Sequence, residues 1–91
     1  MPATANETWG YTLQGKDTPV AVAGEGSAAF TPKSGGVEWF FGPTTGATIP
    51  DACHDADSEV ETSVNVPTGK YLYLIGPAGK LAAVTAATVP A

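Results

Sequence analysis

The residues with the greatest capacity for chemistry lie together between positions 51 and 59. This segment, Asp51-Ala52-Cys53-His54-Asp55-Ala56-Asp57-Ser58-Glu59, contains the one cysteine and the one histidine of the sequence. Carboxylates on alternate residues, as at Asp55, Asp57 and Glu59, are typical of the start of a calcium loop, but that loop needs glycine at its sixth position and glutamate at its twelfth. The sequence has Val60 and Val66 there, so the calcium pattern is not met.

The same segment is a poor match to zinc or nucleophilic sites. Zinc needs further Cys or His ligands at fixed spacing, and a nucleophile and its base normally come from separate elements, whereas Cys53 and His54 are neighbours. With one histidine and no Gly-x-Ser-x-Gly turn, a serine hydrolase is not indicated either. We interpret residues 51–59 as a solvated acidic loop. A loose cation contact between subunits and a small enzyme or metal protein built on this loop are the alternatives. We predict no catalytic residue, no metal site and no cofactor.

A second pattern has the spacing of a nucleotide-binding turn. Gly24-Glu25-Gly26-Ser27-Ala28-Ala29 follows the apolar run at 20–23 and reads Gly-x-Gly-x-x-Ala. In a dinucleotide site these glycines open a helix that receives the pyrophosphate. Pro32 and the Gly35-Gly36 pair would stop such a helix within two turns, so we predict a glycine-rich hairpin turn instead.

The length and net charge of the chain exclude several classes of binding partner. The chain has 91 residues, enough for one domain, with a net charge of −5, four lysines and no arginine. Such a surface cannot neutralise a row of phosphates, so we expect no nucleic-acid and no anionic-membrane partner. No apolar run approaches the length of a membrane span, and the first seven residues lack the basic and apolar regions of a signal peptide. One cysteine permits no intrachain disulfide, and a small core without such a staple favours oligomerisation.

The second half of the chain predicts three strands joined by tight turns. Residues 59–66 alternate strictly, with Val60, Thr62, Val64 and Val66 on one face. Two Pro-x-Gly-Lys turns, at 67–70 and 77–80, flank the run Tyr71-Leu72-Tyr73-Leu74-Ile75, which we expect to be covered on both faces. With a further strand over 81–89, residues 59–88 are predicted to form a three-stranded β-meander.

The first half predicts shorter strands at 8–14, 20–23, 28–31 and 37–41, with turns at 15–19 and 32–36. Six or seven short antiparallel strands and no helical pattern indicate one all-β domain over 1–91, a small sandwich or a partly open barrel. Residues 1–7 are expected to form a mobile arm. Residues 42–58 are expected to form a long loop that is functional or partly disordered.

Aromatic residues supply the candidate contact positions. On a strand, Trp39 and Phe41 share one face and Phe40 takes the other. This arrangement suits a central strand covered on both sides, a contact with another subunit or partner, or a platform for stacking sugars; aromatic side chains are favoured interface anchors. The interface residues that we predict are Trp9, Tyr11, Trp39, Phe41, Tyr71 and Tyr73.

One family resemblance adds to this interpretation. The chain is acidic and rich in Ala, Thr and Gly, and its last third contains Gly69-Lys-Tyr-Leu-Tyr-Leu-Ile-Gly-Pro-Ala-Gly-Lys-Leu-Ala-Ala-Val-Thr85. In composition and in this last third, it resembles the small structural proteins of tailed bacteriophage virions, and is most similar to capsid decoration (cement) proteins. No family motif is present from which a functional residue could be transferred.

The resemblance implies a non-enzymatic, β-rich and commonly trimeric virion protein that clamps neighbouring coat subunits. Its partners would be further copies of itself and the major capsid protein or another virion protein, and its location the virion. A phage tail or fibre component, and a small carbohydrate-binding β-module, are the alternatives.

Overall fold

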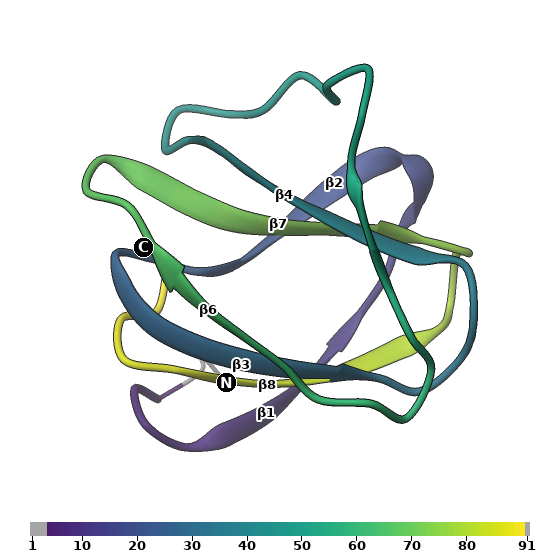
Figure 1. The fold of residues 1–91 in the computed structure, drawn as a ribbon, viewed down its shortest axis with the longest axis horizontal. Coiled ribbons are helices and arrows are strands. Elements are labelled where there is room, and N and C mark those ends of the chain that lie inside the picture. Colours follow the sequence, from purple (N-terminus) through teal and green to yellow (C-terminus); the bar gives the residue numbers. More distant parts are fainter. Residues whose placement is uncertain (1–3, 91) are drawn as a thin grey trace.

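Two four-stranded antiparallel sheets pack face to face (Figure 1). The computed structural model describes residues 4–90, which contain no helix and measure 26 × 26 × 23 Å. The strands are β1 (Thr8–Thr12), β2 (Gly15–Ala23), β3 (Gly26–Pro32), β4 (Val37–Pro43), β5 (His54–Ala56), β6 (Thr62–Val66), β7 (Lys70–Gly76) and β8 (Leu81–Ala86). The predicted all-β sandwich is confirmed.

The order of the strands defines the topology. Sheet A has the order β1-β8-β3-β6 and sheet B the order β2-β7-β4-β5. Strand β1 pairs with β8, β2 with β7, β3 with β6 and β4 with β5. The chain is therefore one long hairpin, with its tip between β4 and β5, that is folded over onto itself. This arrangement is an eight-stranded jelly roll.

The predicted β-meander is wrong, although its three strands exist. Strand β7 lies in sheet B, whereas β6 and β8 lie in sheet A on either side of β3. Both Pro-x-Gly-Lys turns form as expected: the amides of Lys70 and Lys80 donate to the carbonyls of Pro67 and Pro77, at 3.2 and 3.3 Å. Turn chemistry specifies where the chain reverses, but not whether the next strand stays in the same sheet.

Several predicted boundaries also need correction, since there are eight strands and not six or seven. The predicted turn at 15–19 is the first part of β2, where the pairing register shifts before Val20. Residues 59–61 lie outside β6: Glu59 has a φ of 64°, and the Val60 amide closes a turn by donating to the Asp57 carbonyl at 3.3 Å. Strands β4 and β5 occupy parts of the predicted 42–58 loop, so the connection between them is 44–53.

Alternation of side chains along each strand builds the core between the sheets. Strand β3 buries Ala28, Phe30 and Pro32, and turns Ser27, Ala29 and Thr31 outward. The buried core consists of Leu13, Val22, Ala23, Ala28, Phe30, Val37, Ala56, Val66, Leu72, Leu74, Ala82, Val84 and Ala86.

The N-terminal arm was predicted over residues 1–7, of which 1–3 lie outside the described residues. Residues 4–7 form a turn beside the end of β8. The Asn6 amide donates to the Ala86 carbonyl at 2.8 Å, and the Glu7 amide donates to the Thr4 carbonyl at 3.2 Å. These bonds hold the turn against sheet A.

Candidate functional site

Part of the outer face of sheet B is covered by its own chain. Phe40, Tyr73 and Ile75 form a second buried cluster there, and the 44–53 connection places Ala47 and Ile49 over it. In Figure 1 this connection lies at the top, above β4 and β7. The rings of Phe40 and Tyr73 stack at 5.3 Å, which confirms that β7 is covered on both faces. The part of this face around Phe40 and Tyr73 is therefore closed by side chains of the same molecule.

The predicted interface residues of β4 and β7 point in opposite directions. Trp39 and Phe41 share the inner face of sheet B, as predicted, with ring centroids 5.5 Å apart and packed against the core. Tyr71 and Tyr73 share the outer face, with centroids 6.2 Å apart. The Tyr73 hydroxyl donates to the Pro43 carbonyl at 2.5 Å. These two pairs belong to different layers of the sandwich.

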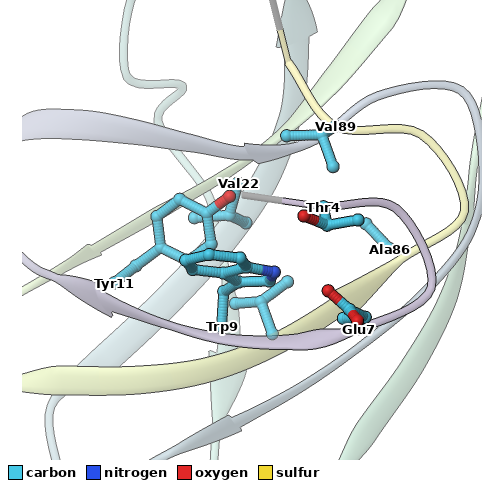
Figure 2. Close-up of a pocket in the computed structure, with 8 residues that line it drawn as sticks. Thr4, Glu7, Trp9, Tyr11, Val22, Ala86 and Val89 are labelled. Atoms are coloured by element: carbon cyan, nitrogen blue, oxygen red, sulfur yellow. The ribbon is translucent and has the colours of Figure 1, made fainter. Parts of the chain in front are cut away.

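Trp9 and Tyr11 lie together at the open edge between β1 and β2 (Figure 2), where Tyr11 also packs against the main core. They line a narrow hollow together with Thr4, Glu7, Val22, Val84, Ala86 and Val89, and it has no room for a water molecule. The indole nitrogen of Trp9 is buried without a hydrogen-bond partner among residues 4–90. Burial also raises the pKa of the Tyr11 hydroxyl above 10.0. This hollow is a packed seam and not a ligand pocket.

The acidic segment does not assemble a catalytic pair. His54 stacks on Trp39, with ring centroids 4.3 Å apart, at the inner side of sheet B. Cys53 packs instead against the outer cluster of Phe40, Tyr73 and Ile75, where its thiol donates weakly to the Pro50 carbonyl at 3.9 Å. The Cys53 thiol and the His54 imidazole therefore lie on opposite sides of sheet B.

Electrostatics further suppress the reactivity of Cys53. Desolvation raises the pKa of its thiol, and the negative charges of Glu38 and Asp55 raise it further. Because the thiolate is the reactive form, this environment makes the thiol a poor nucleophile. Within residues 4–90, no three His, Cys, Asp or Glu side chains are grouped in a way that could hold a metal ion.

Sheet A differs sharply from sheet B, because none of its four strands carries a charged residue. The outward positions of these strands form one surface, which we call the uncharged face. It consists of Thr8, Gly10, Thr12, Ser27, Ala29, Thr31, Ser63, Asn65, Leu81, Ala83 and Thr85. The register places these residues directly across from one another, and the hydroxyls of Thr8 and Thr85 are 2.7 Å apart.

Two features give the uncharged face its shape. A shallow hollow of about 220 Å³ lies at Ala29, where Ser27, Ser63 and Thr85 surround a short side chain. At the far end of the face, Leu81 is 50% exposed, which is unusual for a large apolar side chain in this molecule. Apart from Leu81, the side chains of the face are small or of moderate size, so another surface can approach the backbone closely, most of all at Ala29.

Sequence reasoning missed this face because it searched for aromatic anchors. The detectable signal was the absence of charge: 26–32 and 81–89 contain no Asp, Glu or Lys in a chain with a net charge of −5. Which side of these strands faces outward depends on pairing with distant strands, which a local pattern does not reveal.

Comparisons with known proteins give no relatives: no family model, curated protein or solved structure matches the chain. Within residues 4–90, no helix is long and apolar enough to cross a bilayer.

Proposed function

We propose that the protein is a non-enzymatic virion structural protein, a decoration protein that docks on the outer surface of a coat shell and joins neighbouring coat subunits. The observation that carries this proposal is the uncharged face of sheet A. Docking strips water from both surfaces, and burying unpaired charge is the largest cost of doing so. A sheet face without charge avoids that cost.

The distribution of charge supports the same orientation. All charged residues of the strands lie in sheet B, at Lys16, Asp17, Glu38, Asp55 and Lys70. With sheet A against the shell, these residues and the acidic segment would face solvent. Such a cover adds contacts across subunit boundaries and stabilises the shell by mass action.

Jelly rolls occur in both capsid and lectin domains, so the topology does not choose between a shell protein and a carbohydrate-binding module. A sugar platform needs exposed aromatic rings. The two tryptophans, three tyrosines and three phenylalanines of the chain are all buried or half-buried. That property favours the structural role.

Particle rebinding tests the proposal. Particles assembled without this gene are mixed with purified protein, and bound protein is counted after sedimentation. Ala83→Glu places a carboxylate at the centre of the uncharged face, between Gly10 and Thr31, and should abolish binding. Thr18→Glu adds the same charge on β2 of sheet B and should bind like the wild type. No binding of the wild type, or equal binding of both variants, would refute the proposal.

A further inference from the structure

The edges of the two sheets differ in how well they are protected against strand addition. Natural proteins blunt edge strands with charges, prolines, bulges or shortness. Strand β2 contains Lys16, Asp17 and Pro19 and two register shifts, and β5 has three residues, including Asp55. On β1, the side-chain amide of Gln14 donates to the Thr12 carbonyl at 3.2 Å.

Strand β6 has none of these devices. Its five residues, Thr-Ser-Val-Asn-Val, carry no charge and no proline, and they pair with β3 in an unbroken register. Beside it, Val60 is 52% exposed. Strand β1 also lacks charge and proline and pairs in an unbroken register, but its Thr12 carbonyl already accepts a hydrogen bond from a side chain. Among the edges that the structure describes, β6 is therefore the least protected against a further strand.

The hydrogen-bond pattern shows which groups of β6 are free to pair. The amide of Ala87 donates to the Ser27 carbonyl at 2.9 Å, so the backbone groups of Ser27 face β8. Backbone groups alternate along an antiparallel strand, so those of Ala28 face β6, where Val64 is its partner. The N–H and C=O groups of Ser63 and Asn65 consequently point away from the sheet.

We propose that β6 is a dimer interface, at which β6 of a second copy of this chain adds antiparallel across a two-fold axis at Ser63. In this register Ser63 faces Ser63 of the second copy, and Glu61 faces its Asn65. About six backbone hydrogen bonds form across the junction. Moving the axis to Val64 or Asn65 would place Glu61 or Ser63 opposite Pro67, which has no N–H to donate.

Side chains on both faces are complementary in the same register. On the inner side, Thr62 of one copy lies across from Val64 of the other. Extending the strand by two residues on dimer formation would bring the exposed Val60 across from Val66 of the other copy and cover it. On the outer side, each Glu61 carboxylate faces a neutral amide. The two Glu61 residues are about 13 Å apart along the strands, beyond the screening length of about 8 Å at physiological salt.

The two-fold axis would make one continuous eight-stranded sheet, with both uncharged faces on the same side. The contact stands on the β6 edge alone and not on the proposed virion role. It is an isologous contact, which closes as a dimer, and so it differs from the trimer that the family resemblance implies. A measurement of the molecular mass in solution distinguishes a dimer from a trimer.

The first experiment measures mass by light scattering over a concentration series of the full chain. As the concentration rises, the measured mass of the wild type should increase from that of one chain to that of two. Ser63→Lys places two ammonium groups face to face and should weaken the dimer more than about tenfold. Ser27→Lys, on the same face but on β3, should leave it intact. A wild type that stays monomeric, a stable trimer, or a dimer that tolerates Ser63→Lys would overturn the proposal.

Two further variants keep the test independent of folding defects. Ser63→Pro removes the outward N–H without touching the bonds to β3 and should give a folded monomer by circular dichroism, whereas Ser63→Ala should dimerise. In a Cys53→Ser background, Ser63→Cys should form a covalent dimer, since paired Cα atoms lie about 5.5 Å apart. Asn65→Cys should not. Cross-linking through Asn65→Cys in preference to Ser63→Cys would contradict the register.

Discussion

The ring of Tyr73 lies directly on the backbone of Gly42. A Cβ atom at position 42 would be 2.9 Å from Cε2 of Tyr73 and 3.1 Å from Cβ of Ala47. The Tyr73 hydroxyl then reaches the carbonyl of Pro43, the next residue. The ring is thus held along its face and at its tip, and it supports the connection that covers sheet B.

Gly42→Ala should therefore destabilise the fold. The added methyl overpacks a buried position against the Tyr73 ring and the Ala47 methyl group, which costs about 1–3 kcal/mol in comparable cores. Urea unfolding measures the change in the free energy of unfolding. Gly10→Ala is the matched control, because no atom lies within 4 Å of a Cβ atom there. Equal stability of the two variants would show that the ring moves aside freely.

Tyr73→Phe should change how stability depends on alkaline pH. Burial raises the pKa of Tyr73 above 10.0, with a further contribution from Tyr71. The unfolded chain therefore ionises first: stability is complete below pH 10 and falls as the pH rises towards the pKa of the folded state. Unfolding free energies from pH 8 to pH 11 should fall less steeply for Tyr73→Phe. The variant should lose about 0.5–1.5 kcal/mol at neutral pH with the Pro43 hydrogen bond. Parallel pH profiles would contradict this assignment.

Asp55→Asn should stabilise the protein. Glu38 and Asp55 face each other across β4 and β5, and like charges directly opposite on a sheet are unfavourable, on the order of 0.2–1 kcal/mol. The gain should shrink with added salt. Asp51→Asn, which removes one charge from the 44–53 connection, is the control and should have a smaller effect. A loss of stability in Asp55→Asn would show that this carboxylate has a favourable partner.

Alkylation should report the electrostatics around Cys53. Because its thiol pKa is raised, less thiolate is present at neutral pH, and Cys53 should react with iodoacetamide more slowly than a free cysteine peptide. The double variant Glu38→Gln, Asp55→Asn should react faster than the wild type. An unchanged rate in the double variant would leave desolvation as the sole cause of slow reaction.

Local patterns predicted the strands well and their partners poorly. The alternation around Trp39, Phe40 and Phe41, and that of Leu72 and Tyr73, placed these side chains on the correct faces of their strands. The meander failed because the sheet to which a strand belongs depends on contacts with distant residues. Thr8 and Thr85, for example, are 77 positions apart yet share a hydrogen bond.

The candidate site was predictable only in part, for the same reason. The six aromatic residues were recognised by type, but the structure does not bring them together: Tyr11, Trp39 and Phe41 pack against the main core, Tyr71 and Tyr73 lie on the outer face of sheet B, and Trp9 lines the hollow beside β2. The uncharged face comes from small residues on four strands, and none of these residues is distinctive by itself. It becomes a surface only when β8 enters between β1 and β3.

This insertion has a consequence for synthesis. Each sheet has two central strands, and one of each pair, β8 in sheet A and β7 in sheet B, is among the last two strands to leave the ribosome. Within the described fold, β1 and β2 pair with no other strands. At typical elongation rates of about 5–20 residues per second, roughly 4–14 seconds pass between the synthesis of β1 and that of its pairing partner β8. During that interval Trp9 and Tyr11 lack their neighbours Val84 and Ala86 on β8. We therefore expect translation speed and chaperone supply to govern the yield of native protein.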